Sequence, residues 1–195
     1  MGLRFSRQSS TSRYVALVAV LTALYSIYGV VSGIELRPLT QSLDLFFLLP
    51  VFFAILVSLT GKKWSSTLLG TIIGLLFLYP TAAVPFSPHI TISLIANGLV
   101  YDLYLRESKS DLYDLSKRQL ITAGALGNFA MAVAGLLVFQ IFLGPQATLL
   151  WALKPIGDTV VGALGGFFGW IVIERVRGIR TRRILETKAA LKVRV

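Results

Sequence analysis

The sequence contains no cysteine, one histidine and nine acidic residues among 195. The absence of cysteine excludes disulfides, thiolate metal sites and a cysteine nucleophile, and it says nothing about the redox compartment. A metal centre needs several ligands, and an activated nucleophile needs a positioned base. One histidine and few carboxylates make either kind of site improbable. The phosphate-binding pattern GxxxxGK[ST] is also absent. We therefore expect no enzyme activity, no metal and no cofactor.

Charged residues are scarce, and apolar residues take their place. Only 14% of the residues are charged, 55% are hydrophobic and the mean hydropathy is +0.74. A soluble domain has about 25% charged and 45–50% apolar residues. The composition predicts a polytopic membrane protein that forms a single bundle, because no long hydrophilic block could fold separately.

Six apolar segments approach the roughly 20 residues that a membrane-spanning helix needs. They are 14–33, 43–60, 64–80, 89–105, 118–143 and 155–174. The expected fold class is an all-α membrane protein with six transmembrane helices. The short connection "GKKW" predicts a tight hairpin between the second and third helices, and Pro155 suits the first turn of the last one. No small-residue cleavage site follows the first segment, which we expect to be retained.

The positive charges predict the orientation. If the N-terminus is cytoplasmic, every one of the 19 lysines and arginines lies inside except Arg37 and Lys154. Cytoplasmic flanks keep positive charge during insertion, so both termini are expected inside a multi-pass protein. The basic N-terminus (1–13) and the basic tail (175–195) then flank a helical domain (14–174), with the tail against anionic headgroups. This explains the net charge of +10 without a nucleic-acid partner.

A polar stripe follows the fourth segment, "HITISLIANGLVYDLYL", where His89, Ser93, Asn97 and Tyr101 recur every four residues. This spacing puts them on one helix face, with Asn97 roughly 12 Å below His89. The stripe could form hydrogen bonds that join neighbouring helices, or it could be one wall of an outward-facing ligand cavity. Both interpretations stay open.

Other polar side chains are predicted at the same outer level, and they favour the cavity. The candidates are Arg37, Tyr79, Trp151, Lys154 and Asp158. Asp158 could equally pair with Lys154 at i+4 or meet a helix dipole. Asn128 lies among small residues in "GALGNFAMAVAG", which favours a structural role.

Small residues recur at helix-packing spacing in two segments. Ala19 and Ala23 lie four residues apart in the first segment, and Gly162/Gly166 and Gly165/Gly169 in the last. Such spacing lets helix backbones approach closely in lipid. We expect the glycines to pack inside the bundle, whereas the alanine face could dock another membrane subunit.

The order of these features resembles the substrate-binding S-components of energy-coupling factor transporters. "YVALVAVLTALYS" is similar to the family's first helix with its AxxxA element. "LDLFFLLPVFFAILVSLTGKKWSSTLLGTIIGLLF" resembles its second and third helices, and "PIGDTVVGALGGFFGWIVIERV" its last. The resemblance covers nearly the whole chain, although no single motif is specific.

The resemblance implies six helices, capture of a small water-soluble vitamin in a prokaryotic plasma membrane, and transport driven by a membrane coupling subunit with two ATPases. It makes Ala19 and Ala23 docking residues. By location, it makes ligand candidates of His89, Ser93 and Asn97 and of the outer polar residues. The alternatives are a scaffold or morphogenesis-type membrane protein without a ligand, a stand-alone secondary transporter and an intramembrane enzyme. No inverted repeat supports the secondary transporter.

Overall fold

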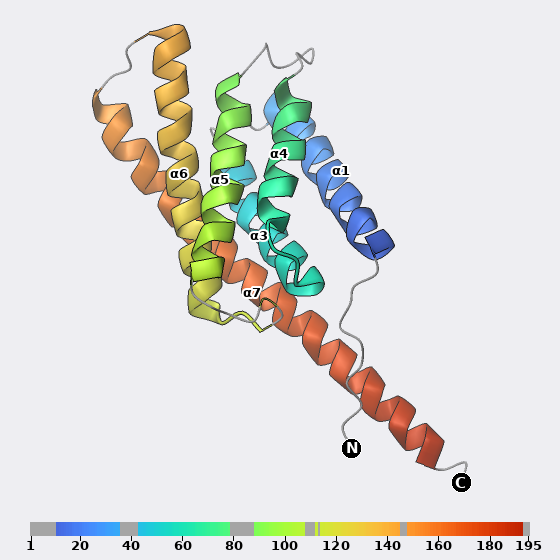
Figure 1. Cartoon of the computed structure of the whole chain (residues 1–195). Coiled ribbons are helices and arrows are strands. Elements are labelled where there is room, and N and C mark those ends of the chain that lie inside the picture. The colour runs from blue at the N-terminus through green and yellow to red at the C-terminus, as the bar shows by residue number, and fades with distance from the viewer. Residues whose placement is uncertain are drawn as a thin grey trace.

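A computed structural model describes residues 11–35, 43–78, 88–107, 112, 114–144 and 148–192, and within them it has helices and no strand. The helices form one bundle (Figure 1). Their bounds are α1 Thr11–Glu35, α3 Leu43–Thr60, α4 Ser65–Leu78, α5 Pro88–Glu107, α6 Lys117–Leu143 and α7 Thr148–Lys192. The six segments predicted from hydropathy thus each become a helix. The all-helical fold class is confirmed.

Among the described residues, four helices are long and apolar enough to cross a membrane, which indicates a multi-pass membrane protein. Their candidate spans are Thr11–Val31, Leu43–Thr60, Lys117–Phe142 and Trp151–Gly178. Helix α4 is apolar but has 14 described residues, about 21 Å at 1.5 Å per residue, against a hydrocarbon core of about 30 Å. Helix α5, which carries the polar stripe, is not among the four candidate spans in the described residues.

Helix α3 lies at the centre, and its candidate span is the most buried of the four. Helices α4, α5, α6 and α7 each pack extensively against the next, and α7 returns to pack along α3. Helix α1 lies at the edge, against α3 and α4 (Figure 1). The predicted "GKKW" turn is tight, but α3 and α4 make few contacts, because α4 turns away to pack against α5.

Close helix approaches depend on glycine at each major interface. A Cβ on Gly70 of α4 would lie 2.5 Å from the Leu94 carbonyl of α5, and one on Gly169 of α7 would lie 2.7 Å from the Ala54 Cβ of α3. Gly162 of α7 meets the Gly124 carbonyl of α6 in the same way. Packing inside the bundle, as expected for the α7 glycines, is confirmed.

Asp102 of α5 caps the start of α4 from a neighbouring helix. Its carboxylate accepts hydrogen bonds from the Thr67 backbone N–H at 2.7 Å, from Thr67 Oγ1 at 2.8 Å and from the Ser66 N–H at 3.4 Å. The first N–H groups of a helix have no partner within it, and a carboxylate there also meets the positive end of the helix dipole. Asp102 therefore ties α5 to the "GKKW" turn.

Replacing Asp102 by alanine is expected to lower the free energy of unfolding by about 1–2 kcal/mol, the usual range for loss of a helix cap. Unfolding of the purified chain in mixed micelles with rising denaturing detergent would measure the change. Glu107→Ala, an exposed acidic position one and a half turns further along α5, is the matched control and should change little. Equal effects of the two substitutions would contradict the capping role.

Helix α7 differs from its prediction at both ends. It begins at Thr148, so Pro155 lies within the helix and not in its first turn. A proline inside a helix removes one backbone hydrogen bond. Such a loss is tolerated where neighbouring helices or side chains satisfy the freed backbone group. The helix also continues to Lys192 beyond its apolar part, and leaves the bundle at the end where α1 begins (Figure 1).

Candidate functional site

The polar stripe on α5 does face one way, into the bundle. Ser93, Asn97 and Tyr101 are buried and His89 is half-buried. The Ser93 hydroxyl donates to the His89 carbonyl of its own helix at 2.6 Å, and the His89 ring meets the edge of Phe139 at 5.2 Å. Among the described contacts of the stripe's hydroxyl and amide groups, the hydrogen bond to another helix is the one that Asn97 makes.

Asn97 and Asn128 join α5 to α6 deep in the bundle, where both side chains are fully buried. Asn97 Nδ2 donates to Asn128 Oδ1 at 2.8 Å and lies 3.4 Å from Met131 Sδ. Asn128 Nδ2 donates to the carbonyls of Phe46 at 2.9 Å and Asp158 at 3.1 Å. Since carbonyl oxygens can only accept, the Asn128 atom that faces them must be the amide nitrogen, and the orientation of the Asn97 amide follows in turn.

The Asn128–Phe46 bond has a local cause in α3. In a regular helix the Phe46 carbonyl would accept from the N–H of residue 50, but Pro50 has none. Asn128 donates to that carbonyl instead. A buried carbonyl without a donor is costly, so the proline in α3 and the asparagine in α6 are energetically linked although they lie far apart in the sequence.

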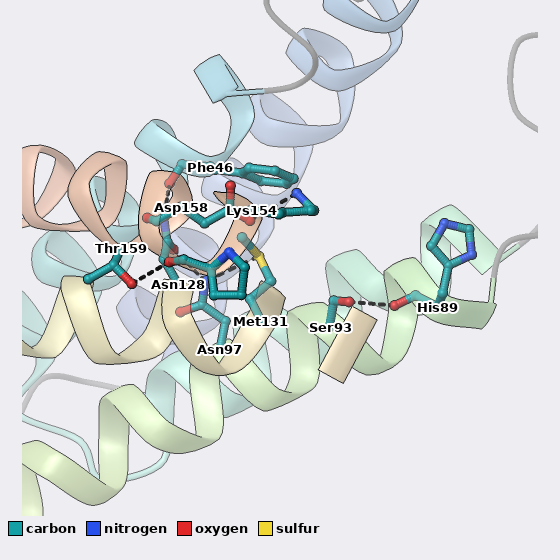
Figure 2. A network of polar contacts seen from close by, with 10 residues as sticks. Phe46, His89, Ser93, Asn97, Asn128, Met131, Lys154, Asp158 and Thr159 are labelled. Atoms are coloured by element: carbon teal, nitrogen blue, oxygen red, sulfur yellow. Dashed lines mark hydrogen bonds and ion pairs between the residues drawn. The ribbon is translucent and has the colours of Figure 1, made fainter. Parts of the chain in front are cut away.

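An ion pair lies next to this amide network, one layer closer to the end of the bundle where α7 begins. Lys154 Nζ lies 2.9 Å from Asp158 Oδ2, and the Lys154 side chain is 36% exposed while that of Asp158 is 3% exposed. The ammonium also lies 4.6 Å from the centre of the Phe46 ring. The pairing of these residues at i+4 is confirmed. Together, Phe46, Asn97, Asn128, Lys154 and Asp158 form what we call the polar cluster (Figure 2).

Glycines make room for the polar cluster. A Cβ on Gly162 would lie 2.7 Å from Asn128 Cβ, and Gly127 of α6 lies against Asn97 Oδ1. Asn97 Oδ1 has no hydrogen-bond partner among the described residues. The cluster therefore contains one buried acceptor, one buried carboxylate and one half-exposed ammonium, a set that could bind groups of either charge.

The remaining predicted residues lie apart from this cluster or outside the described part of the chain. Figure 2 shows His89 and Ser93 further along α5. Trp151 is half-buried in α7, three residues before Lys154. Ala19 and Ala23 are exposed on α1. Tyr79 and Arg37 lie outside the described residues.

Two members of the cluster were not predicted as site residues. Asn128 was assigned a structural role from its small neighbours, and its three hydrogen bonds fit that role. Phe46 is apolar, so its side chain does not suggest a site. Pro50, four positions later, could have indicated it, because a proline inside a helix leaves the carbonyl four residues earlier without its backbone donor. Across the described ranges, no three His, Asp or Glu side chains lie close enough together to hold a metal ion.

The Lys154–Asp158 pair predicts an asymmetric response to mutation. Lys154→Met leaves a buried carboxylate without its cation, whereas Asp158→Asn leaves an ammonium that can reach water. We expect the first to lower the free energy of unfolding by about 2 kcal/mol and the second by less than half as much. Leu153→Met, at an exposed neighbouring position, is the control. Detergent-induced unfolding measures all three, and an equal or reversed order would contradict the assigned burial.

Comparisons with protein-family models, curated proteins and solved structures found no match.

Proposed function

We propose that the chain is the substrate-binding membrane subunit of an energy-coupling factor importer. It captures a small water-soluble vitamin or a related compound at the outer face of a prokaryotic plasma membrane. Six membrane crossings with both termini in the cytoplasm belong to the same proposal. As the resemblance to this family implies, a coupling subunit in the membrane and two ATPase subunits supply the energy, and the sequence itself has no GxxxxGK[ST] motif.

The polar cluster is the observation that carries this proposal. It draws on four helices, α3, α5, α6 and α7, and runs from the half-exposed Lys154 down to the fully buried Asn97. Ionisable side chains are expensive among apolar helices and usually mark a functional site. The cluster lies toward the end of the bundle where α7 begins, which is the outer end in the proposed orientation.

The chemistry of the cluster suggests a role for each group. Lys154 and Asp158 can exchange their mutual ion pair for charged groups of a ligand. Asn97 Oδ1, which has no described partner, can accept a hydrogen bond from a ligand N–H. In this proposal Trp151 stacks on a ligand ring and His89 orients the ligand by a hydrogen bond. Ser93, Tyr79 and Arg37 remain candidates for the rim.

A scaffold without a ligand is the second candidate, and a specific observation favours it. Asn97 and Asn128 already bond to each other and to backbone carbonyls, and Lys154 already pairs with Asp158. Groups that satisfy one another in this way can join helices without any ligand. The two candidates differ in whether the polar cluster rearranges around a small molecule.

Thermal unfolding of the purified full chain against a panel of water-soluble vitamins and their precursors tests the proposal. A ligand at 100 times its dissociation constant should add about 2.7 kcal/mol to the free energy of unfolding. Asp158→Asn should weaken the response to a hit at least tenfold, and Leu153→Met, an exposed position in the same helix, should leave it unchanged. A folded chain that responds to no compound would support the scaffold.

The docking part of the proposal has its own test. Ala19 and Ala23 are exposed on α1, and bulky side chains there would keep a partner helix at a distance. Ala19→Trp and Ala23→Trp should reduce co-purification with a coupling subunit and ATPases while ligand binding persists. Leu137→Trp, on the exposed surface of α6, is the control. Unchanged co-purification of all variants would remove the docking claim.

A further inference from the structure

Basic side chains lie over aromatic rings at one end of the bundle. We call it the basic end, and it is the end where α1, α4 and α6 begin (Figure 1). Lys62 Nζ lies 4.1 Å from the centre of the Tyr14 ring, and Arg106 Cζ lies 5.9 Å from that of Trp64. Lys117 Nζ lies 4.6 Å from the Phe167 ring and 5.4 Å from the Trp170 ring. Lys62 and Trp64 lie in the turn between α3 and α4, and their partners lie on α1 and α5, so cations and rings from separate parts of the fold gather at one level of the bundle.

Trp64 is held at this level at a conformational cost. Its φ of 63° is in the left-handed region, and it is the non-glycine residue with positive φ among those described. That conformation costs an L-residue about 1–2 kcal/mol. The side chain is 41% exposed, so core packing does not explain the strain. An indole held in this way is suited to a membrane interface, where its apolar ring and polar N–H meet different surroundings.

Three cations at the basic end form no salt bridge with a described residue. Lys63, Arg106 and Lys117 have no carboxylate within salt-bridge distance in the described part of the chain. Among the described acids nearby, Asp102 caps α4, Asp114 and Glu174 both pair with Arg177, and Glu107 is exposed next to Arg106 in the chain. The three cations thus face one exposed carboxylate, so the basic end keeps a net positive charge.

Apolar surface begins immediately next to these cations. Leu68 lies one turn along α4 from Trp64 and is 41% exposed, and Leu103 lies three residues before Arg106 on α5 and is 38% exposed. A soluble polyanion would neutralise the cations but leave this apolar surface uncovered. A phospholipid matches both parts, since its phosphate can bind guanidinium and ammonium groups while its acyl chains cover the leucines.

We propose that the basic end is a binding surface for anionic phospholipid headgroups, contacted by Arg106 and Lys63 beside Trp64 and by Lys117 beside Trp170. The tryptophan rings fix the depth of the headgroup level, and the cations select headgroups with net negative charge. This inference is independent of ligand capture, because it uses the opposite end of the bundle from the polar cluster.

The test uses the full chain in nanodiscs made of phosphatidylcholine and phosphatidylglycerol in equal parts. After extraction into mild detergent, native mass spectrometry gives the ratio of the two lipids retained on the protein. The unsubstituted chain should prefer phosphatidylglycerol. The triple variant Lys63→Gln, Arg106→Gln, Lys117→Gln should lose at least tenfold of that preference, because each basic residue near a membrane surface contributes about fivefold.

A charge-conserving triple variant is the matched control. Lys63→Arg, Arg106→Lys, Lys117→Arg should retain the preference, and raised salt during extraction should weaken it in the unsubstituted chain. Equal retention of both lipids by a folded unsubstituted chain would overturn the proposal, as would an unchanged preference in the glutamine variant. Displacement of the lipid by glycerol phosphate, or binding of heparin in place of phosphatidylglycerol, would also overturn it, in favour of a soluble phosphate compound or an acidic macromolecule.

Discussion

Gly162→Val is expected to lower the free energy of unfolding by about 3 kcal/mol or more, the upper part of the range for overpacking in a core. Gly162 lies where α7 crosses α6, against the Gly124 carbonyl, and an added Cβ would lie 2.7 Å from both Cβ and Cγ of Asn128. The valine must therefore separate the two helices or displace the Asn128 amide from its bonds. Either response weakens the most extensive helix interface in the bundle.

The chain offers a matched control for this substitution. Gly157 lies on the same helix, and a Cβ there would meet nothing within 4 Å. Gly157→Val should change the free energy of unfolding by less than about 1 kcal/mol, since it adds no overlap and removes a poor helix former. Unfolding of both variants in mixed micelles measures the difference. A Gly162→Val chain as stable as the Gly157→Val chain would show that the close crossing of α6 and α7 is wrong.

Asn128→Leu is expected to lower the free energy of unfolding by about 2–4 kcal/mol. Leucine has a similar size but removes three hydrogen bonds, to Asn97, Phe46 and Asp158. A single bond between helices in lipid contributes about 0.6 kcal/mol on average, whereas a buried polar group left without a partner costs about 1–3 kcal/mol. The Phe46 carbonyl is such a group, because Pro50 gives it no helical donor.

A double-mutant cycle isolates that last contribution. Pro50→Ala restores a backbone N–H for the Phe46 carbonyl and keeps the Cβ that packs 3.2 Å from the Cβ position of Gly124. In this background Asn128→Leu should cost about 1 kcal/mol less. Ser93→Ala is the control, since its hydroxyl bonds within its own helix, and it should cost less than about 0.5 kcal/mol. The same cost of Asn128→Leu in both backgrounds would contradict the link between Pro50 and Asn128.

The interpretation of the stripe on α5 shows how far residue spacing carries. The four-residue spacing correctly placed Ser93, Asn97 and Tyr101 on one buried face. It could not say what that face meets, because a helix period fixes direction and not the neighbour. In the folded chain Ser93 bonds its own helix and Asn97 bonds Asn128. The contact of Asn97 therefore fits helix joining, whereas the Ser93 hydroxyl is satisfied within its own helix. The charged pair of Lys154 and Asp158 lies on α7, and the proposed function assigns it to a ligand.

Helix α7 shows a different limit. Hydropathy located its apolar part, but Pro155 suggested a start that lies within the observed helix. The rule that proline favours the first turn is a preference in solution, and it yields where neighbouring helices hold the backbone in place. The Asp102 cap was missed for a related reason. The carboxylate and the N–H groups that it serves are 35 residues apart, and no local pattern connects them.

The positions of the helices and the asymmetry of charge along the bundle follow from the order of residues in the chain. The free energy gained when an apolar segment leaves water is roughly proportional to its apolar area. The membrane-spanning segments can therefore be located without knowing which segment packs beside which. The partners of the buried polar groups follow only from the packed structure. A hydrogen bond requires two atoms within about 3 Å, and Asn128 meets the Phe46 carbonyl only because glycines bring α3, α6 and α7 together.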